Sequence, residues 1–366
     1  MMNVKKKEQI NRPIPIIPAR YLSIILILIF VVLGTIAAAE QTNKLEARDS
    51  WREIKLILNA YGAVWCDNRH IAFSGDNFGK SNKGIRIYDL DSGMVQDITN
   101  DPGDENVSCA ADGQYIVFTD KIFGKKQSSL FVYDRSTKTI KKMYEMESIL
   151  LKQIDEMPLS PHANYLLGPD LPEGQKYILP GGKEVKLVPY RRGISSIPEF
   201  SKFQWSFDES RLFLFDPNCG KVTIHSLEDN GDRQLSFGCN LRVMYITKDN
   251  KLYVDIMFGS EIGDNSVTNL YIFDLNNPAK KRKLVSDIEW YDADDEGNIV
   301  FSKGSKNERF ICYLKRGSQQ PQILKEIPVP RDIGIWPRIA KDGKAVFYSI
   351  PIAPRGAREY TILIKN

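Results

Sequence analysis

The sequence predicts an all-β fold, a β-propeller, and three observations carry this prediction. A short aromatic strand that ends in aspartate recurs at residues 85–89, 130–134 and 270–274. A polar turn that leads into an apolar strand comes before it in each unit, as at residues 111–118. Residues 51–366 hold seven such units of about 45 residues, and four short strands every 40–50 residues are typical of propeller blades. We therefore predict seven four-stranded blades.

Within each unit, the residue types favour strands joined by tight turns. Asp112-Gly113 suits a turn that needs positive φ, and the β-branched and aromatic residues after it suit a strand. Two further strand positions, one before this turn and one after the aspartate, bring the count to four. Weaker copies of the aromatic third strand are expected at residues 177–179, where Ile178 would match Tyr88, and at residues 223–227 and 311–314.

The two ends of the repeat region complement each other. The last unit, which begins at Ile335, contains only three strands, whereas residues 52–58 form a predicted strand that belongs to no complete unit. We predict that residues 52–58 complete the last blade, because this pairing would remove the one open seam in the ring.

The first forty residues predict a location at a membrane. Residues 21–39 carry no charge over a length close to the roughly 20 residues that a helix needs to cross a bilayer. Five basic residues and one glutamate come before this segment and should remain in the cytoplasm. We therefore expect a basic tail at residues 1–20, a transmembrane anchor or uncleaved signal at 21–39, a linker at 40–50 and the propeller at 51–366. The protein would cross the cytoplasmic membrane once, with the propeller in the periplasm or outside the cell.

A cleaved signal peptide is the alternative for this segment. Ala37-Ala38-Ala39 has the small side chains of a cleavage site. The apolar segment is longer than the usual 7–15 residues of a signal peptide, so we favour the uncleaved anchor. Both alternatives export the propeller.

Charge and cysteine content exclude some classes of partner and site. The net charge of +4 is carried by the first 39 residues, and the neutral remainder is unsuited to nucleic acid, which requires clustered lysine and arginine. Five cysteines without a CxxC pair predict no zinc site. An oxidising compartment would allow one or two disulfides and leave at least one free thiol, with the connectivity open.

The repeat resembles that of a known family. The segments at residues 88–93, 110–118 and 205–209 look like the WD-repeat-like unit of TolB-type β-propellers. The resemblance covers about six units and concerns the propeller domain only. It implies an exported docking or scaffold module. Related propellers also form the non-catalytic half of prolyl-oligopeptidase-type peptidases and the body of oligogalacturonate lyases.

The sequence shows no set of residues typical of catalysis, and we expect no cofactor or metal. No Gly-x-Ser-x-Gly motif occurs, and His70, His162 and His225 fall in different units. Residues 292–297 resemble the start of a calcium loop, but Lys303 stands where the twelfth-position glutamate of an EF-hand would be. We interpret this segment as a polar turn before a strand.

Three Phe-Gly pairs are the candidate partner-binding residues. Phe78, Phe123 and Phe258 lie between the second and third predicted strands of their units, and Lys80 and Lys125 follow the first two. Aromatic side chains rimmed by lysine on one face would form a binding surface. The alternative is that each phenylalanine packs between blades and the glycine supplies the bend.

These observations predict a non-enzymatic module that binds a protein or peptide at the propeller face. The alternative function is a polysaccharide lyase or hydrolase with its active site at the channel. An enzyme would need converging carboxylates, histidines or a metal near the axis, whereas a docking module would need an apolar, aromatic mouth.

Overall fold

The computed structural model describes most of the chain from Trp51 onward. The predicted tail, anchor and linker lie outside the described residues. In the part of the chain that is described, no helix is long and apolar enough to cross a membrane. The described residues are 51–76, 83–101, 103–121, 127–147, 158–168, 176–189, 202–216, 220–229, 231–237, 241–249, 251–258, 267–275, 277–304, 308–329, 333–351 and 358–366.

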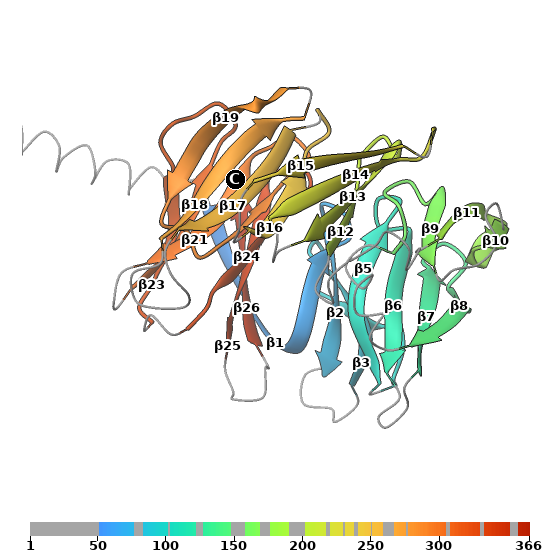
Figure 1. Cartoon of the computed structure of the whole chain (residues 1–366). Coiled ribbons are helices and arrows are strands. Elements are labelled where there is room, and N and C mark those ends of the chain that lie inside the picture. The colour runs from blue at the N-terminus through green and yellow to red at the C-terminus, as the bar shows by residue number, and fades with distance from the viewer. Residues whose placement is uncertain are drawn as a thin grey trace, which may run out of the picture. The chain divides into compact units, whose positions relative to one another are not determined.

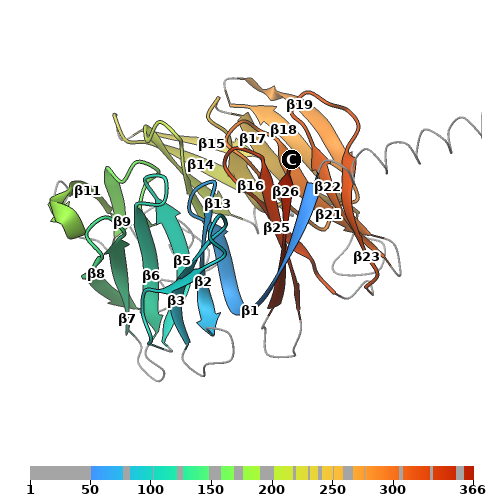
Figure 2. The same ribbon diagram turned by 180° about the vertical axis from the view of Figure 1, so that it is seen from behind.

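The described strands form seven blades around a ring (Figures 1 and 2). Blades 2, 4, 5 and 6 are separate sheets of four antiparallel strands, in which the spatial order of the strands is their chain order. The first strand of a blade lies nearest the axis and the fourth lies at the rim.

Blade 2 holds β5 (Asp104–Ala110), β6 (Tyr115–Lys121), β7 (Gln127–Asp134) and β8 (Thr139–Glu147), and blade 4 holds β12 (Lys202–Trp205), β13 (Arg211–Asp216), β14 (Lys221–Ser226) and β15 (Asp232–Ser236). Blade 5 holds β16 (Leu241–Ile246), β17 (Lys251–Phe258), β18 (Val267–Asp274) and β19 (Asn277–Ser286), and blade 6 holds β20 (Trp290–Ala293), β21 (Ile299–Gly304), β22 (Arg309–Leu314) and β23 (Gln322–Ile327).

Blades 7 and 1 share one long strand, β1 (Trp51–Trp65), and therefore form a single sheet of seven strands. The first part of β1 pairs with β26, with Trp51 opposite Lys365, and its second part pairs with β2, with Ala63 opposite Phe73. The strand is thus outermost in blade 7 and innermost in blade 1. The remaining strands of this sheet are β2 (His70–Asp76), β3 (Lys83–Asp89), β4 (Val95–Asp97), β24 (Trp336–Ile339), β25 (Ala345–Pro351) and β26 (Arg358–Lys365).

The pairing of β1 with β26 confirms the closure that the sequence predicted for residues 52–58. Side chains at the start of β1 also reach blade 6. Trp51 is buried with its ring 5.7 Å from that of Tyr313, and Glu53 forms an ion pair with Lys325. The start of β1 is therefore held by backbone hydrogen bonds to β26 and by an aromatic contact and an ion pair with blade 6.

Blade 3 departs from the regular pattern, and the predicted third strand at residues 177–179 is wrong. The blade contains β9 (Tyr165–Gly168), β10 (Lys176–Ile178) and β11 (Glu184–Pro189) in the order β10-β11-β9, with a short 3-10 turn, η1 (Pro180–Gly182), before β11. It is β11 that occupies the third position, parallel to β9, and Ile178 is half exposed at the rim.

The reversal in blade 3 has a local cause. Gly181 and Gly182 have φ of 80° and 91°, which glycine adopts at little cost, so the chain turns back after β10. The turn brings Val185 and Leu187, both buried, beside the second strand. These two buried apolar side chains at alternate positions favour β11 as the third strand of the blade. The side chains of β10 are exposed, intermediate and exposed in turn, so β10 is suited to the rim.

The core lies between the blades. On β13, Phe213 and Phe215 face blade 5, whereas Leu212 and Leu214 belong to the cluster shared with blades 2 and 3. Successive side chains on a strand point to opposite faces, so each sheet contributes one face to each neighbour. Each of the six buried apolar clusters draws its members from at least two adjacent blades. No blade encloses a core alone, and the stability of each depends on its neighbours.

Polar contacts link neighbouring blades at one end of the ring, which we call the turn face because the turns between first and second strands lie there. Arg135 Nη1 lies 3.1 Å from Asp67 Oδ2, and Gly113 packs tightly between these blades with φ of 82°. Further contacts join other neighbours: Ala111 N–H to Pro161 O (2.7 Å), Ser160 Oγ–H to Glu209 Oε1 (2.5 Å), Lys248 Nζ to Asp295 Oδ2 (3.2 Å) and Asp342 N–H to Asn68 Oδ1 (3.0 Å).

A disulfide joins blades 1 and 2. Cys66, directly after β1, is bonded to Cys109 in β5, with the two Cα atoms 4.9 Å apart. Cys312 is a free, buried thiol, in agreement with the odd cysteine count. The other two cysteines lie outside the described residues.

Trp51→Ala should lower the free energy of unfolding by about 3–5 kcal/mol, because it removes a buried indole from the closing contact between β1 and blade 6. Arg52→Ala, at the exposed neighbouring position, should change it by less than about 0.5 kcal/mol. Urea unfolding followed by circular dichroism measures both. Equal stability of the two variants would contradict the closing role of β1.

Replacing Cys66 and Cys109 together by serine should lower the free energy of unfolding by about 4 kcal/mol, since the bond closes a loop with a sequence separation of 43. Thermal unfolding with and without reductant provides the comparison. The parent should lose stability on reduction, whereas the double variant should be insensitive to reductant. A parent that melts at the same temperature in both conditions would show that the bond does not contribute.

Candidate binding site

Most of the predicted partner-binding residues cannot be placed. Phe78, Lys80, Phe123 and Lys125 lie outside the described residues, and of Phe258 only the backbone is described, as the last residue of β17 opposite Val267. The described strands show that all three Phe-Gly segments connect second strands to third strands: β2 to β3, β6 to β7 and β17 to β18. Their role in binding stays a prediction.

The strand directions place the ends of the second strands that precede these segments at the end of the ring opposite the turn face. Each first strand runs toward the turn face, and the antiparallel second strand runs back. The second strands therefore end, and the third strands begin, at the end of the ring where the first strands begin. Trp290 begins β20 and Trp336 begins β24, so both lie at this end, which we call the tryptophan face.

Trp290 and Trp336 form an aromatic pair across two adjacent innermost strands. Their ring centroids are 5.3 Å apart at an interplanar angle of 61°. Trp336 is 41% exposed, whereas its neighbour Pro337 is buried between blades. Gly334 lies close to both rings: an added Cβ would come within 3.4 Å of the Trp336 indole nitrogen and 3.7 Å of that of Trp290. A methyl group at Gly334 would therefore make ordinary van der Waals contact with both rings.

The alternation along β20 and β24 explains why a polar pair lies behind the aromatic pair. Residues two apart on a strand share a side, so Asp292 follows Trp290 and Arg338 follows Trp336. An oxygen of Asp292 lies 3.7 Å from Arg338 Nη1, and the other accepts the backbone N–H of Ile339 at 3.0 Å. Burial raises the pKa of Asp292, although the Arg338 guanidinium opposes this shift.

Blade 1 adds one further aromatic residue at the turn-face end of this row, because Trp65 ends its innermost strand, whereas Trp290 and Trp336 begin theirs. Trp65, the last residue of β1, donates its indole N–H to the backbone oxygen of Arg338 at 3.3 Å and packs 5.5 Å from the ring of Phe347. Three adjacent innermost strands thus present Trp65, Trp290, Asp292, Trp336 and Arg338 on their less buried side. We call these five residues the tryptophan cluster.

The tryptophan cluster combines large apolar rings with one carboxylate and one guanidinium. Indole rings present a broad apolar surface to a ligand and an N–H donor at one edge. The Arg338 side chain is 52% exposed, and its guanidinium can donate to a carbonyl or carboxylate. The arrangement is suited to binding an extended segment that carries apolar groups and backbone or hydroxyl oxygens.

Sequence reasoning did not identify the tryptophan cluster, although a signal existed. Trp290-x-Asp292 and Trp336-x-Arg338 lie about one unit apart, at the same position in their blades. The pattern alone did not show that this side of the strand is left uncovered. Trp205 in blade 4 also lies on an innermost strand but is buried at 2% exposure, so the residue type does not decide the matter.

The three histidines lie apart and each has a local partner. His70 Nδ1 lies 2.8 Å from Asp67, His225 Nδ1 lies 2.8 Å from Asp232, and His162 packs edge-on against Phe207 at 4.9 Å. These contacts fall in blades 1 and 4 and between blades 3 and 4. Among the residues that the structure describes, no group of three or more histidines, cysteines, aspartates or glutamates could hold a metal ion.

In the segment that resembles a calcium loop, the predicted polar turn follows the end of β20 at Ala293. Asp294 accepts the backbone N–H groups of Glu296 and Asn298 at 3.0 and 2.8 Å, and the side-chain amide of Asn298 at 2.6 Å. Gly297 has φ of 86°, as such a turn requires. The carboxylate oxygens are therefore occupied by donors of their own turn.

Comparisons with known proteins define the fold class. No family model and no curated protein matches this chain. Among solved structures, a prolyl endopeptidase is 13% identical with a TM-score of 0.55, and the match covers 80% of this chain but only 46% of the endopeptidase. Oligogalacturonate lyase from Vibrio parahaemolyticus is 10% identical with a TM-score of 0.51, covering 86% and 97% of the two chains. TolB from Acinetobacter baumannii is 13% identical with a TM-score of 0.40, covering 87% and 64%.

At these identities, the likeness concerns the fold. The chain is a seven-bladed β-propeller, as the repeat predicted, and its structural neighbours include TolB among other β-propellers. The chain spans less than half of the endopeptidase it resembles.

Proposed function

We propose that this protein is a membrane-anchored, extracytoplasmic β-propeller that binds a protein or peptide at its tryptophan face. The observation that carries the proposal is the exposure of Trp336, 41%, beside Trp290 on the innermost strands. Tryptophan and arginine are enriched among the residues that dominate the binding energy of protein interfaces. Trp336 and Arg338 provide both types at alternate positions of one strand.

The predicted Phe-Gly segments extend the same proposal. The strands that flank them end at the tryptophan face, so the phenylalanines and the tryptophan cluster would contribute to one surface. An apolar centre with a polar rim is the usual composition of an interface. Lys80 and Lys125 would then supply the rim and adjust association rate and salt dependence.

Two observations support a location outside the cytoplasm. The Cys66–Cys109 disulfide is of the kind that persists in oxidising compartments and is rare in the cytosol. The charge-free segment at residues 21–39, with basic residues before it, would hold the chain in the cytoplasmic membrane with the propeller on the far side.

A polysaccharide lyase or hydrolase is the second candidate function, and the environment of Asp292 favours it. A carboxyl group whose pKa is raised by burial is a candidate proton donor or acceptor, and it lies beside Arg338 and the tryptophan pair. Sugar rings also pack against indole rings. If the parent protein degrades an acidic polysaccharide and Asp292→Asn does not, the result would favour this function over the binding module.

Trp336→Ala should weaken partner capture about 30-fold or more, since an aromatic anchor at an interface contributes about 2 kcal/mol. The matched control is Met94→Ala, which removes another exposed apolar side chain, 68% exposed, in the turn between β3 and β4 on the opposite face. Capture from solubilised membranes, quantified by mass spectrometry for each variant, provides the measurement. The melting temperature of both variants should stay close to that of the parent.

The same capture experiment tests the Phe-Gly segments through the double variant Phe78→Ser/Phe123→Ser. Loss of capture with unchanged melting temperature would assign these residues to the surface. A large drop in melting temperature would show that they pack between blades. Equal capture by the parent and Trp336→Ala would contradict the proposed function.

A further inference from the structure

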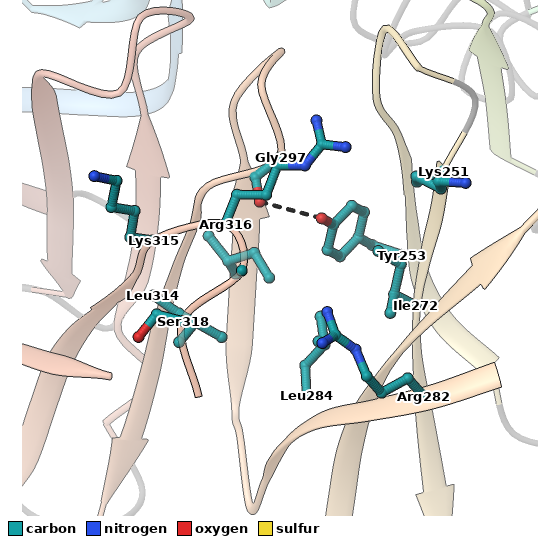
Figure 3. A pocket seen from close by; sticks show the side chains of 12 residues that line it. Lys251, Tyr253, Ile272, Arg282, Leu284, Gly297, Leu314, Lys315, Arg316 and Ser318 are labelled. Atoms are coloured by element: carbon teal, nitrogen blue, oxygen red, sulfur yellow. Dashed lines mark hydrogen bonds between the residues drawn. The ribbon is translucent and has the colours of Figure 1, made fainter. Parts of the chain in front are cut away.

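A pocket lies between blades 5 and 6 on the turn face, away from the tryptophan cluster (Figure 3). Its volume is about 210 Å³. Blade 5 contributes residues of β17, β18 and β19, and blade 6 contributes the turn after β20, the start of β21, the end of β22 and the turn after it. The lining residues are Lys251, Tyr253, Ile272, Arg282, Leu284, Gly297, Ile299, Leu314, Lys315, Arg316, Gly317 and Ser318.

The walls of this pocket are largely apolar. Ile272 and Leu284 of blade 5 face Ile299 and Leu314 of blade 6 across the space. The ring of Tyr253 forms another wall, held in place because its hydroxyl donates to the backbone oxygen of Gly297 at 3.1 Å. A cavity of about 150 Å³ with apolar walls is enough to hold benzene, so this pocket has room for a ring and a short side arm.

The charged residues of the pocket all carry the same sign. Four cations and no carboxylate line it. Two of the cations are paired with carboxylates outside the pocket: Lys251 with Asp274 at 2.6 Å and Arg316 with Asp249 at 2.5 Å. Arg282 and Lys315 form no ion pair with any described residue, so no described carboxylate compensates these two charges.

Arg282 is placed to reach a ligand in the pocket. Figure 3 shows its guanidinium between Leu284 and the ring of Tyr253, whereas Lys315 extends away from the space. Burial raises the pKa of Tyr253 to about 12, while the positive charges of Arg316 and Arg282 act in the opposite direction. The guanidinium of Arg282 is therefore close enough for its field to be felt at the phenol.

We propose that this pocket binds an organic carboxylate with an apolar body, such as a free aryl or alkyl acid or the C-terminal residue of a peptide. The apolar body would occupy the space between the leucine and isoleucine walls. The carboxylate would lie on Arg282, whose planar fork can donate two parallel hydrogen bonds to it. The proposal does not depend on the function proposed for the tryptophan face, because the two sites share no residue.

The probe for this test is 3-phenylpropionate, which combines a ring, a two-carbon arm and a carboxylate. Isothermal titration calorimetry on the full-length protein in detergent should give a Kd below about 1 mM. The neutral amide, 3-phenylpropanamide, should bind at least about 10-fold more weakly, because it lacks the charge that pairs with Arg282. Inorganic phosphate should not compete at the same concentration, because it has no apolar body.

Arg282→Gln should weaken binding of 3-phenylpropionate by about 10-fold or more. The matched control is Lys283→Gln, which removes the same charge from the next residue of β19 and does not line the pocket. Its Kd should stay within about 2-fold of the parent. Trp336→Ala, on the other face, should also leave this Kd unchanged, so failure of one site is distinguishable from failure of the other.

Two peptide arms identify the source of the carboxylate. Acetyl-Gly-Gly-Phe with a free C-terminus should bind if the ligand is a peptide end, and its C-terminal amide should not. Binding of 3-phenylpropionate without binding of the peptide acid would support the proposal and identify the ligand as a small molecule. No heat of binding with either acid, equal affinity for the acid and the amide, or equal affinity of the parent and Arg282→Gln would overturn it.

Discussion

The ring depends on the antiparallel pairing of β1 with β26. Every other blade is built from strands that follow one another in the chain, so local turns bring them together. Blade 7 alone requires a strand from the opposite end of the repeat region, with Trp51 opposite Lys365. Without this pairing, β26 would be an open edge of its sheet. The Trp51 side chain would also be missing from the apolar cluster that contains Tyr313 and Leu363.

Closure also determines where the candidate site lies. Because β1 continues from the rim of blade 7 to the axis of blade 1, it delivers Trp65 to the backbone of Arg338 at its far end. Ring closure and the tryptophan cluster are thus linked by a single strand. The adjacent blades contribute the aromatic pair and the Asp292–Arg338 contact, so the cluster exists only once blades 6, 7 and 1 are assembled.

The features predicted from the sequence are the ones that depend on local residue patterns. The strands at residues 85–89, 130–134 and 270–274 are correct because alternation and the following turn are encoded within a few residues. Blade 3 was assigned wrongly because positive φ at Gly181 and Gly182 reverses the chain and brings β11 inward. Whether β10 or β11 becomes the third strand depends on packing across the blade.

The sites depend on contacts that no single unit contains. The pairing of Cys66 with Cys109 follows from the approach of two blades. Likewise, Trp205 and Trp336 both lie on innermost strands, but their neighbours bury the first and leave the second exposed. The pocket around Arg282 is lined by residues of two blades, so neither blade alone contains it. Periodicity predicts the blades but does not predict what lies between them.

Hydrogen exchange of β26, followed by mass spectrometry, tests the closed ring most directly. If β1 covers this strand along its length, the amides of residues 358–365 should exchange as slowly as those of β25, the strand on their other side. Exchange of these amides as fast as that of the exposed turn around Asp91 would contradict the closed ring.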